Sequence, residues 1–473
     1  MIFSQSVFLF LFFPLTLLVY FGLIKSRAHK NIFLTIMSLF FYAWGEPVFV
    51  LVMLGSICLN WYCGLRVDDS HPLSERKRWV TTAVISNVLI LGVFKYTGFF
   101  MTNINAVFGL SLPVPDIALP LGISFFTFQA MSYVIDVYRG DGKAQKSLMD
   151  VCLYIAFFPG LVAGPIVRYQ TFADQIDDRR ETIDDFTAGA RRFMVGLAKK
   201  VIIADNLLKM VKDAYALPAN ELSVGVAWFA AVFAHVWVFF DFSGYSDMAL
   251  GLARMFGFKL LENFNYPMIA KSVGDFWRRW HISLSTWFRD YVFFPMGGSR
   301  VSKLRLIFNM LVLWSLTGLW HGADWRYLLW GMGFAIIQIL ERFTGLGKWM
   351  EKHWIGYIYS NVVVCIITVL LATAMNAPGS TTMTAIQRMG AMFGIGATGL
   401  WDVRASMYLR EYGAYILMAT AFSLPTGDWL EHKLHVPHNI MEIGRAVGLG
   451  CALIATISYI AMGGFSAFVY GNF

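Results

Sequence analysis

The sequence predicts an all-α polytopic membrane protein, and three observations support this fold class. Hydrophobic residues make up 57% of the 473-residue chain and charged residues only 14%, whereas soluble domains carry about 25% charged residues. Several apolar runs approach the roughly 20 residues that a helix needs to cross a bilayer. Lys and Arg collect in segments between these runs, as in cytoplasmic loops. We expect about 11 transmembrane helices of this length, together with re-entrant and interfacial helices.

We expect one membrane domain over residues 1–473, with a core over 1–375 and additional C-terminal helices over 376–473. The apolar segments of the N-terminal part lie at 7–23, 32–44, 48–65, 80–101 and 119–137. The first has no basic stretch before it and no small-residue cleavage site after it, which favours a retained helix over a signal peptide. Basic loops after residue 23 and before residue 80 are predicted to be cytoplasmic, so Met1 is expected outside.

Segment 151–167 contains Pro159-Gly160 and Gly164-Pro165 and has basic residues on both sides. A run that enters and leaves on one side is a re-entrant segment, which is tolerated only where protein or a water-filled cavity surrounds it. A spanning helix kinked at proline is the alternative. Both interpretations predict an irregular interior.

Further apolar segments are expected at 224–252, 306–322, 325–340, 355–374, 412–424 and 446–468. Segment 193–210 is only partly apolar because it carries Lys199, Lys200 and Asp205. Residues 376–410 show no clear period, and we assign no element to them. No internal repeat is visible, so a transporter built from inverted halves gains no support.

Segment 276–298 is predicted to be an interfacial helix. Helical spacing gives it an aromatic side formed by Trp277, Trp280, His281, Leu284, Phe288 and Tyr291. The opposite side is polar and carries Arg279, Thr286, Arg289 and Asp290. A helix with these two sides lies at a membrane surface rather than across it.

His321 is the first candidate for chemistry. It lies within the nearly uncharged run 306–322 and is therefore expected within the membrane, where an ionisable residue is costly and is a functional candidate by default. Imidazole takes up protons near neutral pH, so it suits the removal of a proton from a hydroxyl that attacks a thioester or ester carbonyl. A histidine held by a structural hydrogen bond is the alternative.

His281 is the second candidate, because the aromatic side of the interfacial helix would shield it from water. The residues alone leave three roles open. It is a second proton-handling group, a donor to a developing oxyanion, or a packing residue.

Arg278, Arg279 and Arg289 are expected on the cytoplasmic side beside this helix. Their guanidinium groups suit the phosphates of coenzyme A, and lipid headgroups are an equal alternative. We also expect Trp320, next to His321, to contact substrate.

Asp241, Tyr245 and Asp247 interrupt the apolar segment 224–252. Carboxylates within a membrane are rarely without function, and these are expected to orient a histidine or to pair with a cation. We assign all three to the surroundings of the substrate.

The five cysteines show no paired spacing, so neither a disulfide framework nor a metal site is expected. The net charge of +8 is attributed to cytoplasmic loops near anionic lipid and not to nucleic-acid binding.

Five long motifs carry a family resemblance. They are LPLGISFFTFQAMSYVIDVYRG (119–140), FFPGLVAGPIVRY (157–169), FDFSGYSDMALGLARMFGF (240–258), RRWHISLSTWFRDYVFFPMGG (278–298) and LTGLWHGADWRYLLWG (316–331). Together they resemble the membrane-bound O-acyltransferase (MBOAT) family, and more narrowly its bacterial alginate and peptidoglycan O-acetyltransferase branch. The resemblance extends from Met1 to about residue 375.

The resemblance implies a funnelled helical fold with a tunnel between the two membrane faces. His321 matches the invariant catalytic histidine of the family, and His281 matches a position where the family has a functionally important histidine or asparagine. The implied enzyme is an O-acetyltransferase of the bacterial inner membrane that serves an exported polysaccharide. No cofactor is expected to be bound permanently, since acetyl-CoA would be a donor substrate.

The implied partner is a periplasmic acetyltransferase of the SGNH-hydrolase type. Two alternatives stay open. One is a D-alanyl-type transferase whose donor is a pantetheinyl carrier protein. The other is a transporter or channel for a glycan, in which His321 would belong to a proton relay.

Overall fold

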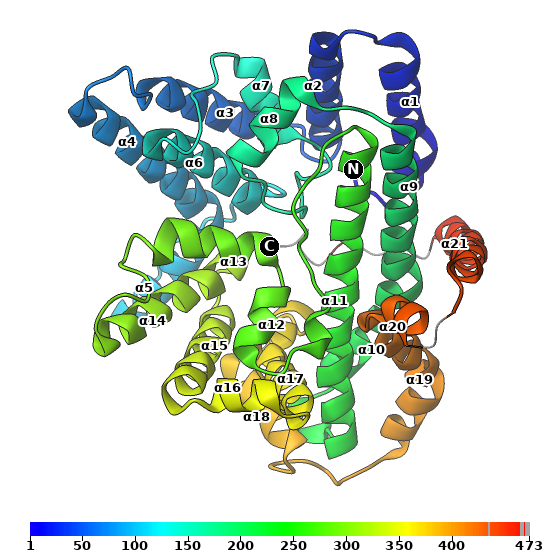
Figure 1. Cartoon of the computed structure of the whole chain (residues 1–473). Helices are drawn as coiled ribbons and strands as arrows, with labels where there is room; N and C mark the ends of the chain where they lie inside the picture. The colour runs from blue at the N-terminus through cyan, green and yellow to red at the C-terminus, as the bar shows by residue number, and fades with distance from the viewer. Residues whose placement is uncertain (434–435, 464–467, 469–473) are drawn as a thin grey trace. The chain divides into compact units, whose positions relative to one another are not determined.

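The computed structural model describes residues 1–433, 436–463 and 468, and every regular element in these residues is a helix (Figure 1). The predicted all-α class is therefore confirmed. The helices form two compact units. The first contains Met1–Met194, Tyr245–Leu261 and Phe468, and the second contains Val195–Gly244 and the described residues from Glu262 to Gly463. A single domain over 1–473 stays a prediction.

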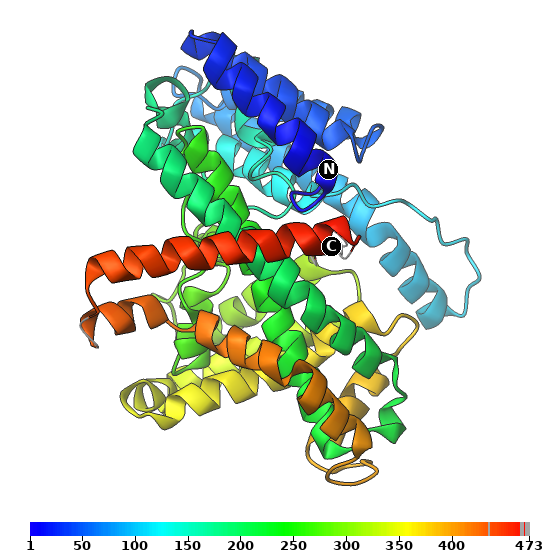
Figure 2. The ribbon, with the colours of Figure 1, turned by 90° about the vertical axis from the view of Figure 1, so that its right-hand side faces the viewer.

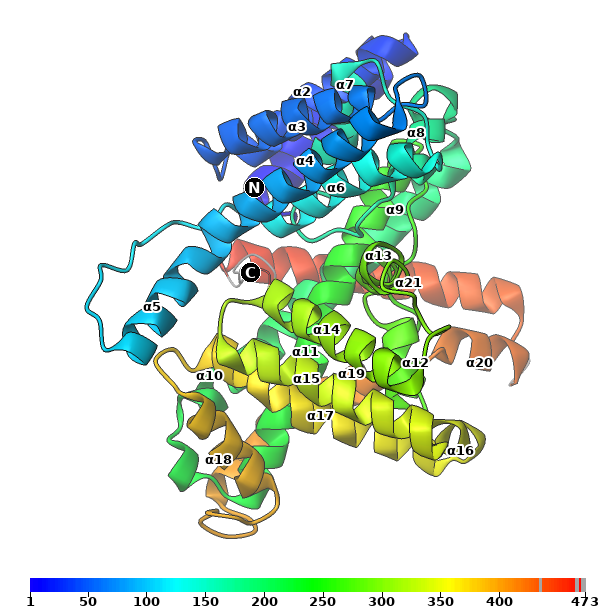
Figure 3. The same cartoon turned by 90° about the vertical axis from the view of Figure 1, so that its left-hand side faces the viewer.

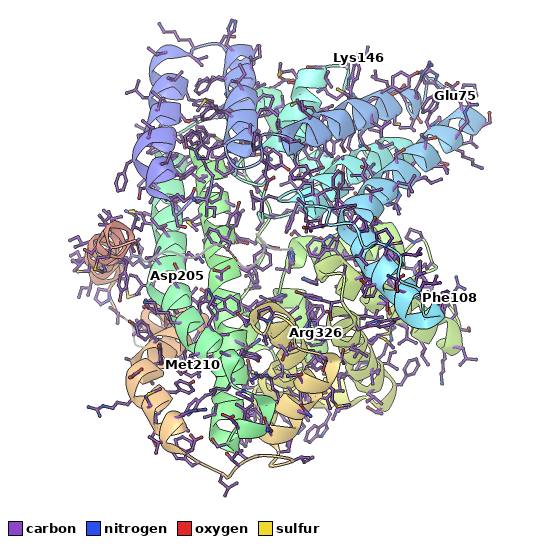
Figure 4. All side chains as sticks on the ribbon, turned by 180° about the vertical axis from the view of Figure 1, so that it is seen from behind. Glu75, Phe108, Lys146, Asp205, Met210 and Arg326 are labelled. Carbon is purple, nitrogen blue, oxygen red and sulfur yellow. The ribbon has the colours of Figure 1, made fainter. Side chains whose placement is uncertain are left out.

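The first unit begins with a continuous helix in which π and α turns alternate, η1 (Phe8–Phe12), α1 (Phe13–Leu17) and η2 (Leu18–Leu23). The elements that follow are α2 (Arg27–Ala43), α3 (Phe49–Arg66), α4 (Leu73–Leu91), η3 (Gly92–Tyr96), α5 (Thr97–Phe108), α6 (Ile123–Arg139), α7 (Leu148–Ala156), α8 (Tyr169–Asp178) and α9 (Ile183–Ala198). In Figure 4, Glu75 and Phe108 mark the two ends of the long α4–η3–α5 helix.

The predicted segment 151–167 is helical only as far as Ala156, the end of α7. The Pro-kinked spanning helix is therefore wrong, whereas the irregular interior is observed. Residues 157–167 are non-helical and buried. Their backbone finds partners in neighbouring side chains, because Tyr154 Oη donates to the carbonyl of Val167 at 2.8 Å and Phe158 N donates to Ser38 Oγ at 3.1 Å. These bonds satisfy polar groups that would be costly to bury unpaired.

The second unit contains η4 (Lys199–Ala204), α10 (Asp205–Ala216), η5 (Ala219–Glu221), η6 (Pro267–Ile269), α12 (Val273–Arg279), α13 (Ile282–Phe288), η7 (Arg289–Phe293), α14 (Lys303–His321), α15 (Trp325–Thr344), α16 (Leu346–Lys352), α17 (Ile355–Asn376), α18 (Thr382–Met392), α19 (Val403–Ser423), α20 (Thr426–His432) and α21 (His438–Ala461). The unassigned stretch 376–410 thus contains α18 and the start of α19. Helix α11 (Val224–Met255) runs through both units.

The described part of the chain contains five helices that are long and apolar enough to cross a bilayer. They are α3, the α4–α5 helix, α11, α17 and α21. Helix α21 is the uninterrupted red helix of Figure 2. The shorter apolar helix at Phe8–Leu23 coincides with the first predicted span. The expected number of transmembrane helices stays a prediction.

The closest helix pair of the second unit is α14 and α15, which lie side by side with α17 in Figure 3. Their contact is antiparallel, because Gly318 lies against Tyr327 and Gly331 lies against Trp314. A Cβ atom on Gly331 would collide with the carbonyl oxygen of Trp314 and would lie 3.2 Å from the Cα of Gly318. Two glycines therefore set how closely the helices approach.

Substituting Gly331→Val is expected to force α14 and α15 apart and to destabilise the protein by about 1–3 kcal/mol, the usual cost of overpacking. The measurement is the unfolding midpoint of the detergent-purified protein. Gly413→Ala on α19 is the matched control, because a Cβ there meets only the Leu409 side chain at 3.8 Å. Equal midpoints for the two variants would contradict this account of the contact.

Candidate active site

His321 is the last residue of α14, and its side chain is buried. Ser302 caps the start of this helix, and Asp324 caps the start of α15 by accepting a hydrogen bond from Arg326 N at 2.8 Å. The short connection folds α15 back along α14. The His321 ring consequently meets two indoles edge to face, Trp320 at 4.9 Å and Trp330 at 4.8 Å between centroids.

His281 lies in a break between two short helices. The predicted continuous helix over 276–298 is wrong, because α12 ends at Arg279 and α13 begins at Ile282. His281 has a positive φ of 46°, a conformation that side chains larger than glycine rarely adopt. The predicted aromatic side is nevertheless buried except for the half-buried Tyr291, and His281 itself is 0% exposed.

Asn263 holds the His281 ring. The Oδ1 atom of Asn263 accepts hydrogen bonds from Ser283 N at 3.2 Å and from Ser283 Oγ at 2.9 Å, and it lies 3.2 Å from His281 Nδ1. Because a backbone N–H can only donate, the Ser283 bond identifies this Asn263 atom as the oxygen. His281 Nδ1 therefore donates its proton, and Nε2 of the neutral ring carries the lone pair.

The two histidines share one apolar environment. Trp320 lies 6.0 Å from the His281 centroid and also contacts His321, while Phe242 packs edge to face on His281 at 4.6 Å. Burial holds the pKa of His281 well below 6.5, and the neighbouring His321 lowers this pKa further. His281 is therefore neutral at physiological pH.

A cavity of about 740 Å³ is lined by residues of α12, α13, α14 and α15, and its described lining includes neither histidine. Its wall includes Trp277, whose ring contacts Trp330 at 5.7 Å, and Trp330 in turn contacts His321. Thr317 on α14 also lines the cavity, one helical turn or about 6 Å along the axis before His321. The indoles of Trp277 and Trp330, which contact each other, link the wall of the cavity to the imidazole.

Cationic side chains stand around this cavity. Of the three predicted arginines, Arg278 and Arg289 line it, and both are more than half exposed. Arg279 is not among its described lining residues and pairs with Asp275 at 3.1 Å. Arg342 and Lys348 also line it, and the sequence analysis did not select them, because each lies outside the recognised motifs.

Asp241 faces a cation rather than a histidine. Its Oδ1 lies 2.6 Å from Lys200 Nζ, which also pairs with Asp205 at 2.8 Å. All three side chains are buried, and Figure 4 marks Asp205 at the start of α10. Of the two predicted supporting roles, pairing with a cation is the observed one. A role in substrate binding stays a prediction.

Tyr245 and Asp247 belong to the first unit. Asp247 accepts from Arg192 at 2.9 Å, and Tyr245 stacks on Phe3 with centroids 4.8 Å apart. Their described contacts are thus structural, and their assignment to the substrate site is a prediction that these contacts do not test.

The fold and the site define a class, an all-helical membrane protein with two histidines buried beside a basic-rimmed cavity. The family model described as MBOAT, membrane-bound O-acyltransferase family, matches residues 142–376. The probable alginate O-acetylase AlgI of Pseudomonas aeruginosa is 42% identical over 351 residues, which cover 73% of this chain and 67% of the relative. This chain belongs to the MBOAT family and is an O-acyltransferase.

Two further relatives are named for other activities. The peptidoglycan O-acetyltransferase of Helicobacter pylori is 34% identical over 372 residues, covering 72% of this chain and 70% of the relative. The teichoic acid D-alanyltransferase of Bacillus subtilis is 31% identical over 261 residues, covering 52% of this chain and 65% of the relative.

The low pKa of His281 predicts a pH dependence of stability. Below about pH 6.5, His281 binds a proton in the unfolded chain but stays unprotonated in the folded chain. The contribution of His281 to the free energy of unfolding is therefore full above this pH and is lost as the pH falls. The unfolding midpoint measured from pH 7 to pH 5 should fall more steeply for the wild type than for His281→Gln. Parallel slopes would contradict the buried, neutral assignment.

Proposed function

We propose that this enzyme takes an acetyl group from a cytoplasmic thioester, acetyl-CoA, and passes it on for O-acetylation of a polysaccharide outside the bacterial inner membrane. The single observation that carries the proposal is the cavity of about 740 Å³, which is lined by four cations and by Trp277, because the Trp277 ring contacts the Trp330 ring that packs on His321. The names of the alginate and peptidoglycan relatives support acetyl as the group transferred.

In the proposed reaction, His321 removes the proton from an acceptor hydroxyl as the hydroxyl oxygen attacks the thioester carbonyl. A carbon–oxygen bond forms, the carbon–sulfur bond breaks, and the thiolate takes the proton from the imidazolium to leave as free thiol. The indoles of Trp320 and Trp330 exclude water from this imidazole. Exclusion of water protects the thioester from hydrolysis.

In this proposal, the Nε2 atom of His281 accepts a hydrogen bond inside the site. The Nδ1–H of this ring is directed to Asn263, so in the neutral ring Nε2 carries the lone pair that would take a proton from a substrate or from His321. A donor to an oxyanion requires a second ring proton, which burial opposes. Of the three roles open from the sequence, the geometry favours the proton-handling one over the oxyanion donor.

The acceptor side is assigned to a periplasmic partner of the SGNH-hydrolase type, which would carry the acetyl group to the glycan. A highly charged thioester does not cross a bilayer, whereas an acetyl group is small and uncharged. If the acetyl group passes through the protein, the thioester donor can stay in the cytoplasm while the acceptor stays outside.

A D-alanyl transferase that uses a pantetheinyl carrier protein is the second candidate. The teichoic acid relative favours it, but the match covers only 52% of this chain. A glycan transporter with His321 in a proton relay lacks a supporting relative among these proteins.

His321→Ala should lower O-acetylation of the cell's exported glycan at least about 100-fold, within the range that a general base contributes. The measurement is mass analysis of the glycan from cells that produce each variant at equal membrane levels. His353→Ala is the matched control, because His353 is exposed and stacks only on Trp349 among the described rings. Full acetylation with His321→Ala would exclude the proposed base, and loss of the exported glycan itself would indicate the transporter.

A further inference from the structure

A groove lies between the end of the first helix and α2, within the first unit. Its volume is about 380 Å³, and the two helices lie side by side in Figure 1. The described lining combines basic with apolar side chains and includes no carboxylate. The basic pair is Lys25 and His29, and the apolar wall is formed chiefly by Leu23, Ile32, Phe33 and Ile36.

The basic and the apolar part of the groove are separated along α2. Lys25 lies just before this helix, and His29 lies in its first turn. Phe33 follows one turn later and Ile36 about another turn on, so that Ile36 is about 10 Å along the axis from His29. The Ile36 side chain is 55% exposed. A ligand that follows the groove therefore meets positive charge at one end and a hydrocarbon surface beyond it.

The charge at the basic end is not neutralised within the described chain. Two neighbouring cations, Arg27 and Lys30, both pair with Glu181, at 2.5 Å and 3.5 Å. Lys25 and His29 are exposed, and neither makes an ion pair with a described residue. The groove therefore keeps a positive charge that attracts an anion.

The position of the groove limits the kind of anion that fits. It begins at a basic connection between two apolar helices, and such connections lie at the membrane surface. Lys and Arg at this level attract anionic lipid headgroups. A soluble anion would contact the basic end and leave the apolar wall uncovered. An uncharged chain would cover the wall and leave Lys25 without a partner.

We propose that this groove binds an anionic phospholipid whose phosphate lies at Lys25 and His29. One acyl chain follows the wall formed by Ile32, Phe33 and Ile36. Phosphatidylglycerol has the required chemistry, because it joins one negative phosphate to two hydrocarbon chains. The inference goes beyond the proposed function and does not depend on it, since the lipid takes no part in acyl transfer.

The headgroup contact is tested by native mass spectrometry of the full chain, titrated with phosphatidylglycerol and with phosphatidylcholine of the same acyl chains. The wild type should bind phosphatidylglycerol more tightly. Lys25→Gln should raise the Kd for phosphatidylglycerol about 5-fold, the loss expected for one lysine at an anionic headgroup, and should leave the Kd for phosphatidylcholine unchanged. Lys25→Arg keeps the charge and should keep the preference. Lys77→Gln, at another exposed lysine of the first unit, is the control that should change neither Kd.

The apolar wall is tested with Ile36→Ala. This change removes hydrocarbon surface from the groove and should raise the Kd for both phospholipids about 2- to 5-fold. Ile443→Ala on α21, at an isoleucine that is 64% exposed, is the matched control and should change neither Kd.

Equal affinity of the wild type for the two phospholipids, or a preference that survives Lys25→Gln, would overturn the proposed headgroup contact. An equal effect of Ile36→Ala and Ile443→Ala would show that lipid covers all apolar surfaces alike, which would overturn the groove as a site. Inorganic phosphate is the last probe. If it bound with the same dependence on Lys25 while Ile36→Ala left lipid binding unchanged, the occupant would be a soluble anion and the proposal would be wrong.

Discussion

The close approach of α14 and α15 is the constraint on which the described site depends. Where Gly318 and Gly331 meet, neither helix has room for a Cβ atom. This contact, with the turn at Asp324, brings Trp330 of the second helix against His321 at the end of the first. The imidazole is thus covered by rings from both helices, and Trp330 in turn contacts Trp277 on the wall of the cavity. A wider spacing would admit water to the histidine.

A second constraint acts on the chain before α14. The left-handed residue His281 interrupts what would otherwise be one amphipathic helix, at a cost in backbone strain that the surroundings must offset. Asn263 provides that support by binding the ring, and its carbonyl also accepts from Ile282 N. Strained residues cluster at functional sites, where strain serves preorganisation. At this position the strain directs one imidazole inward beside another.

Much of this arrangement follows from the sequence. The uncharged run before His321 predicted a buried imidazole, and helical spacing in 276–298 selected the side that is buried. The break at His281 was not predicted, because periodicity is insensitive to one left-handed residue whose support, Asn263, lies 18 positions earlier. The identity of the cation that pairs with Asp241 was not predicted, for a similar reason. Lys200 was noted as polar, but its pairing joins positions 41 residues apart.

The cavity was the feature furthest from prediction. Trp277 was assigned only to an aromatic side. A sequence pattern does not show that this indole lines a cavity, since this depends on packing between α12, α14 and α15. Arg342 and Lys348 belong to helix ends whose direction is fixed by the turn at Gly345, which has a positive φ of 77°.

The central claim is that the acyl carbon of a bound thioester lies at His321. A cryo-electron microscopy structure with an acetyl-CoA analogue in which CH₂ replaces the sulfur tests it most directly. The account predicts the acetyl carbonyl beside the His321 ring, with room for a hydroxyl oxygen about 3–3.5 Å from the carbonyl carbon, and the nucleotide at the cationic rim. An acetyl group that ends outside the indole wall, out of reach of that imidazole, would contradict it.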